Sequence, residues 1–339
     1  RALANAGSFP LTVATGEAPP IAKLAAAPFG VLEHTPEAML PITLRHVQAD
    51  LRPAAPGGQV RIKRLDNDAE VIAWYRKLDR FHETRLSAQA LGRPRSEWLE
   101  WVQDTDDSGK PVRRQVERLI ATRELSLLAA EPGTRRLELP QLQGGDPRPF
   151  EVVGLPLPEP GYHVVEVESR RLGQALLDKA APMYVRSGVL VTNLAVHLKR
   201  GRENAVVWVT SLDRGRPVAD AEVAVSDCEG RRLWAGRTDA AGLARVPQHL
   251  DAPETCSDGE SVFVSARKAF KAADGREQMD MAFVFDGWSK GIEPWRFDLP
   301  VSSDAMPDHR AHTVFDRTLL RAGETVGMKH FVRRESLQG

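Results

Sequence analysis

The sequence predicts a mainly β protein built from tandem seven-stranded antiparallel β-sandwiches. Apolar and polar residues alternate over short stretches such as residues 40–47, as they do in strands with one buried face. Turns rich in Gly and Pro separate these stretches at the spacing of a sandwich. The chain has 339 residues, which is enough for two or three domains of ordinary size.

Residues 188–303 are predicted to form one complete sandwich. Turn signals such as residues 213–217 and 238–242 separate the strands. The strand-like stretches together have the length that a seven-stranded sandwich requires. They are residues 189–198, 205–212, 221–226, 232–235, 243–246, 261–266 and 280–285.

Residues 1–187 are predicted to form an earlier sandwich of the same kind, interrupted by an α-helical insertion at about 66–128. Asn67, followed three residues later by Glu70, has the pattern of a helix capping box. Apolar residues then recur at helical spacing towards Gly92, and a second helical pattern begins at Ser96. The expected strands of this domain lie at residues 8–13, 40–47, 137–139, 150–153 and 163–167.

Residues 304–339 are predicted to start a further domain of the same kind. Strands are expected at 313–320 and 325–332, on either side of a turn at 321–324. Two strands are too few for a sandwich, so we expect a truncated domain. Both ends of the sequence look like the boundaries of a piece of a longer chain.

Charge and motifs exclude several function classes. Lys plus Arg and Asp plus Glu both number 46, so the formal net charge is zero. Without a basic excess, binding to nucleic acid or to anionic lipid is not expected. The sequence has no phosphate-binding Gly loop, no GxSxG nucleophile motif and no metal-ligand spacing. We therefore expect no enzyme activity, no cofactor and no metal.

Cys228 and Cys256 are the two cysteines of the chain. Their spacing fits neither a zinc ribbon nor a CxxC redox pair. Two cysteines in one segment indicate either a single disulfide or two buried thiols.

Gly161 and Tyr162 follow a Pro-containing turn and begin a predicted strand. A Tyr in this position can bury its ring while its hydroxyl bonds the backbone, as in the tyrosine corner of Ig-like sandwiches. The alternative is a Tyr that is merely close to a turn.

Trp74, Trp98 and Trp101 all lie in the predicted insertion. Grouped on a surface, they would form a candidate docking face for a partner or a platform for stacking sugars. Aromatic residues at helical spacing more often pack an insertion against its sheet, and we favour that interpretation.

Several distinctive phrases follow one another along residues 148–335. They are residues 150–157 (FEVVGLPL), 160–162 (PGY), 190–199 (LVTNLAVHLK), 207–212 (VWVTSL), 215–219 (GRPVA), 238–243 (TDAAGL), 291–295 (GIEPW) and 316–317 (DR) with 321–326 (RAGETV). In these phrases and their order the sequence resembles bacterial alpha-2-macroglobulin-like proteins. Residues 8–48, with 19–23 (PPIAK) and 28–30 (PFG), resemble the preceding domain of that family.

The resemblance implies consecutive macroglobulin domains, similar to fibronectin type III, that serve as scaffold in a broad-range protease-trapping inhibitor. Neither cysteine is followed by the Glu-Gln of the family's thioester motif, so the thioester, like the protease-cleaved bait segment, is expected outside this sequence. A structural or adhesive cell-envelope module of tandem Ig-like domains is the alternative.

The resemblance also implies a compartment and partners. It places the protein in the periplasm, with a lipid anchor in the inner membrane as an option for the full-length protein. That oxidising compartment favours the disulfide between Cys228 and Cys256 over free thiols. Proteases are the expected partners of the full-length protein, envelope proteins are further candidates, and a monomer is expected. Because interfaces between domains of one chain are usually modest and polar, we expect relative motion between the sandwiches.

Overall fold

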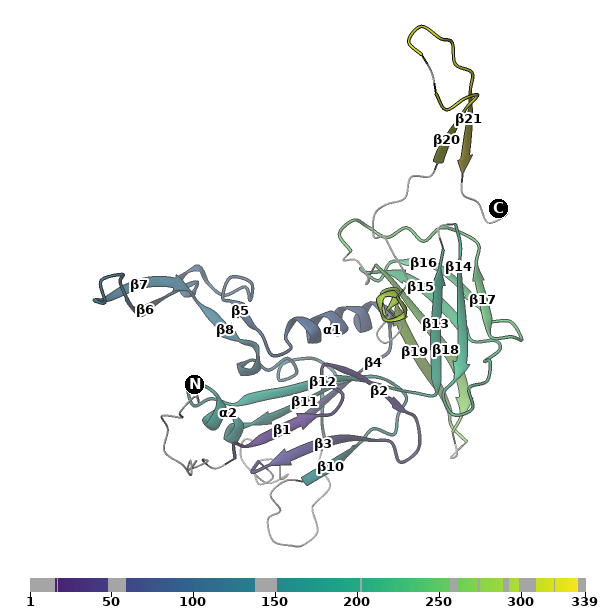
Figure 1. Ribbon diagram of the computed structural model, residues 1–339. Coiled ribbons are helices and arrows are strands. Elements are labelled where there is room, and N and C mark those ends of the chain that lie inside the picture. The colour runs from purple at the N-terminus through teal and green to yellow at the C-terminus, as the bar shows by residue number, and fades with distance from the viewer. Residues whose placement is uncertain are drawn as a thin grey trace, which may run out of the picture.

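Figure 1 shows the computed structural model of the chain. It describes residues 16, 18–47, 59–137, 151–201, 203–256, 261–272, 275–288, 293–298, 309–319 and 321–334. The strand predicted at residues 8–13 lies outside the described residues.

The first sandwich packs a three-stranded sheet, in the order β1-β3-β10, against a five-stranded sheet, in the order β2-β12-β11-β4-β9. Neighbouring strands are antiparallel except β2 and β12, which are parallel. Buried Ile42, Leu155 and Val165 belong to the core between the sheets. The strands are β1 (Ile21–Leu24), β2 (Phe29–Glu33), β3 (Met39–Arg45), β4 (Gln59–Leu65), β9 (Arg135–Leu137), β10 (Glu151–Pro156), β11 (Gly161–Ser169) and β12 (Met183–Thr192).

The second sandwich has the seven predicted antiparallel strands, in sheets ordered β13-β14-β17 and β16-β15-β18-β19. In β14, Ala205, Val207 and Val209 are buried while Trp208 between them is exposed, which is the period-two pattern of a half-buried strand. The strands are β13 (Leu194–Arg200), β14 (Ala205–Ser211), β15 (Glu222–Asp227), β16 (Arg232–Arg237), β17 (Leu243–Val246), β18 (Val262–Lys271) and β19 (Glu277–Phe285).

The stretch 189–198, predicted as one strand, is two strands in different sandwiches. β12 pairs with β11 and β2 of the first sandwich up to Thr192, and β13 begins the second sandwich at Leu194. The change of sheet therefore falls at Asn193, five residues beyond the boundary expected at 187/188.

The insertion is less helical than the sequence suggested. Helix α1 (Asp68–Arg80) begins as predicted, because the Asn67 side chain accepts a hydrogen bond from the backbone N–H of Glu70 at 2.9 Å. The second predicted helix is wrong: apart from the single turns η2 (Arg95–Glu97) and η3 (Thr122–Glu124), the rest forms short strand pairs. These are β5 (Arg85–Ser87) with β8 (Leu119–Ala121), and β6 (Leu99–Thr105) with β7 (Pro111–Glu117).

A tight turn connects β6 to β7, and the hairpin that they form projects from the body of the molecule (Figure 1). The carboxylate of Asp106 accepts hydrogen bonds from the backbone N–H groups of Ser108 and Lys110, both at 2.9 Å. Gly109 takes the positive φ of 81° that the turn requires. Leu99 and Trp101 are two residues apart, which is the spacing of side chains on one face of a strand. The helix was inferred from Trp98 and Trp101, which are three residues apart.

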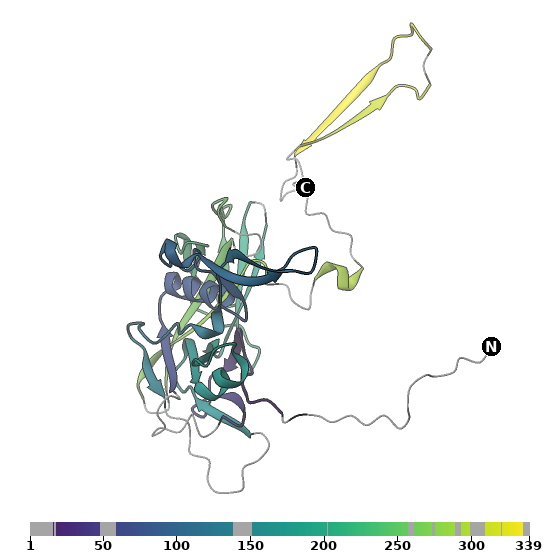
Figure 2. The ribbon, with the colours of Figure 1, turned by 90° about the vertical axis from the view of Figure 1, so that its left-hand side faces the viewer.

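The remaining elements are helix α2 (Arg170–Leu176), turn η4 (Pro294–Phe297) and the antiparallel pair β20 (His309–Phe315) with β21 (Met328–Arg334). Both views show this last pair away from the two sandwiches (Figure 2). None of the helices in the described ranges has the length and hydrophobicity of a membrane span.

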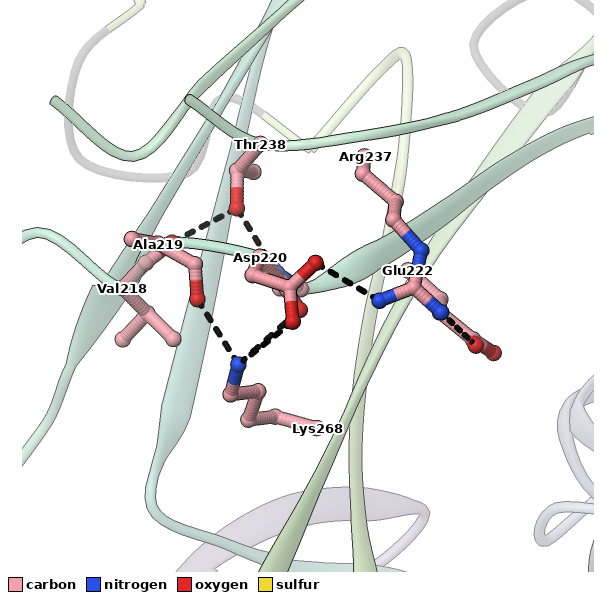
Figure 3. A network of polar contacts seen from close by, with 8 residues as sticks. Val218, Ala219, Asp220, Glu222, Arg237, Thr238 and Lys268 are labelled. Carbon is pink, nitrogen blue, oxygen red and sulfur yellow. Dashed lines mark hydrogen bonds and ion pairs between the residues drawn. The ribbon is translucent and has the colours of Figure 1, made fainter. Parts of the chain in front are cut away.

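A network of charged side chains fixes the turn before β15 (Figure 3). Arg237 bridges Asp220 at 2.7 Å and Glu222 at 2.5 Å, and Lys268 donates to the backbone oxygens of Ala219 and Asp220. The hydrogen bond from Arg237 holds the pKa of Asp220 below its usual range. Asp220 has a positive φ of 55°, so this network stabilises a conformation that side-chain-bearing residues rarely adopt.

Candidate functional site at the junction of the two sandwiches

Helix α1 lies between the two sandwiches and joins their cores (Figure 1). Val71, Ile72 and Leu78 of the helix are buried in a single hydrophobic cluster. That cluster also contains Leu190 of the first sandwich and Val207 of the second. The insertion therefore supplies a layer that both sandwiches share.

Aromatic rings fill the centre of this junction. Phe29 of β2 lies 5.5 Å from Phe283 of β19 and 5.5 Å from Tyr75 of α1, measured between ring centroids. Trp288 lies 5.1 Å from Phe29, and Tyr162 packs edge-on against Phe283 at 5.5 Å. Such edge and tilted pairs each add about 0.5–1.5 kcal/mol beyond the area they bury.

Hydrogen bonds and an ion pair attach α1 to the second sandwich. Buried Asp68 accepts from the Ser265 hydroxyl at 2.9 Å and from the Arg267 guanidinium at 2.6 Å. About two turns further along the helix, Arg76 donates to the carbonyl oxygen of Cys228 at 2.9 Å. The helix position is thus fixed by directional bonds as well as by packing.

Asp280 of β19 holds the linker between the sandwiches. Its carboxylate accepts from the Thr192 hydroxyl at 2.7 Å and from the Asn193 backbone N–H at 2.9 Å. Burial raises the pKa of Asp280, an effect that these hydrogen bonds oppose. Asn193 in turn donates its side-chain amide to the carbonyl of His34. The interface between these two sandwiches is apolar and tethered at the linker, unlike the modest polar interface expected from the sequence.

Glu166 of β11 fixes the end of the insertion to the first sandwich. It is 0 % exposed and accepts from the Ser126 hydroxyl at 2.5 Å and the Leu127 backbone N–H at 2.7 Å. Arg186 stands 3.6 Å from its carboxylate and donates to the carbonyl oxygens of Thr122 and Leu125. Burial lowers the pKa of Arg186, against the attraction of Glu166.

Tyr162 and Gly161 lie at the start of β11, but their arrangement is not a tyrosine corner. The Tyr162 ring is fully buried, and among the described residues its hydroxyl has no hydrogen-bond partner. The hydroxyl points at Gly188, where the Cβ atom of any larger residue would lie 2.2 Å from the oxygen. The second sandwich covers Tyr162, so its ring serves the junction rather than the turn.

We expect Tyr162→Phe to raise the free energy of unfolding by about 1 kcal/mol. A buried hydroxyl without a partner carries a desolvation cost that Phe lacks, while the ring contacts remain. Urea denaturation followed by tryptophan fluorescence measures the change. A loss of more than about 1 kcal/mol would show that the hydroxyl makes a stabilising hydrogen bond after all.

His163, beside Tyr162, is buried in its neutral form. One ring nitrogen bonds the carbonyl oxygen of Glu159 at 2.8 Å, and Nδ1 has no partner within the described ranges. Burial lowers the pKa of His163 from 6.5 to about 4. The folded state therefore resists protonation at a pH where the unfolded chain accepts a proton.

Stability should consequently fall by about 3 kcal/mol as the pH drops from about 6.5 to 4. Between these two pH values the unfolded chain binds a proton at this histidine that the folded protein does not bind, so a lower pH favours unfolding. His163→Gln, which keeps a donor for the Glu159 carbonyl, should flatten this part of the profile. Urea titrations at several pH values compare the two proteins, and parallel profiles would contradict the assignment.

The structure does not bring the three predicted tryptophans together. Trp74 is buried in the junction, with Lys77 4.1 Å above its ring. Trp98 is half-buried and donates its indole N–H to the Arg93 carbonyl. Trp101, 58 % exposed, lies on the projecting hairpin. The favoured core interpretation holds for Trp74 alone, and the three side chains share no docking face.

Cys228 and Cys256 form a disulfide in the second sandwich. In the described ranges, no three His, Cys, Asp or Glu side chains converge as metal ligands would. The junction offers apolar packing, an ion pair and directional hydrogen bonds.

Comparison with known proteins identifies the second sandwich. Residues 191–304 match the family of the bacterial alpha-2-macroglobulin MG3 domain. The second sandwich is an MG3-like domain of the bacterial alpha-2-macroglobulin type. The match covers β13 to β19, the complete second sandwich, and confirms the resemblance that the sequence phrases indicated.

Solved structures of Escherichia coli alpha-2-macroglobulin are also similar to this chain. The crystal structure spanning domains NIE-MG1 is 15 % identical, with 79 % of this chain and 98 % of that chain covered and a TM-score of 0.41. The crystal structure spanning MG0-NIE-MG1 is 14 % identical, with 79 % and 66 % covered and a TM-score of 0.39.

A cryo-EM structure of the native E. coli protein is 15 % identical and has a TM-score of 0.40. It is matched over 95 % of this chain but only 16 % of its own length, so this chain spans about a sixth of that protein. A search of curated protein sequences finds no match.

Sequence reasoning missed the two buried carboxylates of the junction. Glu166 alternates with Val165 and Val167, which is also the pattern of a solvent-facing residue in a half-buried strand. Asp280 begins a predicted strand and has no distinguishing neighbour. Only the knowledge that another layer covers β11 and β19 separates these residues from ordinary surface carboxylates.

Proposed function

We propose that this chain is a scaffold segment of an extracytoplasmic, broad-range protease-trapping inhibitor. The observation that carries the proposal is the match of the second sandwich to the bacterial alpha-2-macroglobulin MG3 domain. The inhibitory activity would belong to the full-length protein, with proteases as its partners and with the bait and any thioester outside this sequence.

The junction supports a mechanical role for the segment. Because α1 and the aromatic cluster join the two sandwiches through one core, the pair can transmit a displacement as a single body. In a trap, such a unit would hold neighbouring domains in place until bait cleavage releases them. The segment would act through shape and connection, without catalysis.

The disulfide supports an extracytoplasmic location. Structural disulfides persist in oxidising compartments such as the bacterial periplasm and are rare in the cytosol. The pairing of Cys228 with Cys256 therefore supports a periplasmic location.

The proposal is tested by mixing the full-length protein with several proteases of different specificity. We expect discrete bait cleavage on gels, loss of proteolysis of large substrates and residual activity on small peptide substrates. The chain of residues 1–339 alone should leave every protease active on large substrates. Unchanged digestion of large substrates by all proteases in the presence of the full-length protein would refute the proposal.

A further inference from the structure

A groove of about 800 Å³ runs along the edge of the first sandwich. Its walls come from β1, from the first half of β12 and from residues 81–85 of the insertion. Apolar Leu24, Leu176 and Val185 contribute to its lining. The groove shares Arg186 with the anchor of the insertion described above, and the inference drawn from it is independent of protease trapping.

One wall of the groove is a strand edge without a neighbour. β2 pairs with β12 only from Gly188 to Thr192, because the chain before Phe29 turns away to β1 in the other sheet. In the described part of the chain, residues 183–187 of β12 have β11 as their one strand neighbour.

The polar backbone groups on that edge can be assigned from the register. The Gly188 N–H donates to the Pro28 carbonyl at 2.8 Å, so Gly188 directs its backbone away from β11. Backbone groups in a strand alternate sides, and Tyr184 and Arg186 therefore direct theirs the same way. An edge with unpaired N–H and C=O groups is a template for another strand.

The groove is positively charged. Lys23, Arg85, Arg123 and Arg186 line it, against the single carboxylate of Glu83. Lys23 and Arg85 are exposed, and neither forms an ion pair with the described residues. Arg186 is 6 % exposed, and its Nη1 has no hydrogen-bond partner among them, although Glu166 lies behind it. Two cations at the rim are thus free to meet a negatively charged ligand.

We propose that this groove docks an extended acidic peptide segment of another protein, which adds as a strand beside residues 183–187 of β12. Five residues of strand span about 17 Å, and the main chain of such a segment would pair with Tyr184 and Arg186. Alternate apolar side chains face the groove floor, and acidic ones meet Lys23 and Arg85. The chain's net charge is zero, so this local excess of cations selects acidic over basic segments.

Three fluorescent peptides test the proposal by anisotropy against the full chain: EVEVEVE, KVKVKVK and EVEPEVE. We expect EVEVEVE to bind at least about tenfold more tightly than KVKVKVK, with affinity falling as salt rises. EVEPEVE keeps the charge but lacks a central N–H, and should also lose about tenfold. Equal binding of the acidic and basic peptides, or equal binding of EVEVEVE and EVEPEVE, would overturn strand addition in this groove.

Two matched variants locate the binding. Lys23→Glu with Arg85→Glu should weaken EVEVEVE by about tenfold or more. Lys110→Glu with Arg113→Glu makes the same charge change on the projecting hairpin and should leave affinity unchanged. Equal losses in both variants would refute the site.

Amide hydrogen exchange supplies a readout that needs no variant. EVEVEVE should slow exchange at Tyr184 and Arg186 and leave β14 unaffected. Unchanged exchange at these two amides refutes the strand. Protection already present without peptide, and released by deleting residues 1–15, would assign the groove to the chain's own N-terminal segment and overturn the proposal.

Discussion

Glu166→Ala is expected to lower the free energy of unfolding by about 3–5 kcal/mol, the largest effect of any single substitution considered for this chain. Removing the carboxylate takes away the acceptor of the Ser126 hydroxyl and of the Leu127 backbone N–H. It also leaves the buried guanidinium of Arg186 without its counter-charge. An uncompensated buried charge accounts for most of the expected loss.

Glu168→Ala is the matched control, because Glu168 lies two residues along the same strand. It pairs with Arg61 at 2.8 Å and, with a 13 % exposed side chain, reaches solvent. Its loss should cost only about 1 kcal/mol, since Arg61 keeps a counter-charge in Glu166, whose carboxylate lies 3.9 Å from the same Nη1. Guanidinium denaturation followed by fluorescence compares the two variants. Equal small losses would show that Glu166 is not a buried anchor.

Amide hydrogen exchange can show which part of the protein Glu166→Ala destabilises. Ser126 and Leu127 end the insertion, so Glu166→Ala should speed amide exchange in residues 122–128 before it affects β18. Exchange that rises first in β18 would place the weak point in the second sandwich instead.

The strands of the second sandwich were predictable because each is bounded by strong turn signals. β17 (Leu243–Val246) has the predicted bounds, and β14 and β15 differ from the predicted ones by a residue. These strands alternate buried and exposed residues or are short apolar runs between Gly- and Asp-containing turns. Local sequence determines such elements, so the family resemblance and the alternation of apolar and polar residues predict the same strands.

Elements that depend on tertiary cover were not predictable in the same way. β11 is buried along almost its whole length, because the core covers one face and α1 with the second sandwich covers the other. The alternation of apolar and polar residues in β11 therefore does not indicate which side chains are exposed to solvent. The helical spacing of Trp98, Trp101 and Val102 was misleading, because Trp98 ends the turn η2 while Trp101 and Val102 lie on opposite faces of strand β6.

The junction could not be derived from the sequence for the same physical reason. Phe29, Tyr75, Tyr162 and Phe283 are distant along the chain, and no local pattern links them. Asp68 meets Arg267 only when α1 docks on the second sandwich. The disulfide could be predicted from the sequence for two reasons. Cys228 and Cys256 lie in the same sandwich, and the family resemblance implied an oxidising compartment.

Replacing Cys228 and Cys256 together by Ala should lower the free energy of unfolding by about 3.6 kcal/mol. The disulfide joins residues 28 apart in sequence, and the chain-entropy model gives this loss for a loop of that size. Guanidinium denaturation of the oxidised wild type, the reduced wild type and the double variant measures it. The reduced wild type should match the double variant, and an unchanged midpoint in both would contradict the prediction.

The same experiment tests whether the two sandwiches unfold together. The Cys228 carbonyl accepts a hydrogen bond from Arg76 of α1, and α1 belongs to the core shared with Leu190. Loss of the disulfide should therefore speed amide exchange in β12 along with β15, and denaturation should remain a single transition. Two separate transitions, with β12 unaffected, would mean that the junction does not couple the sandwiches. In that case the pair could not transmit a displacement as one body.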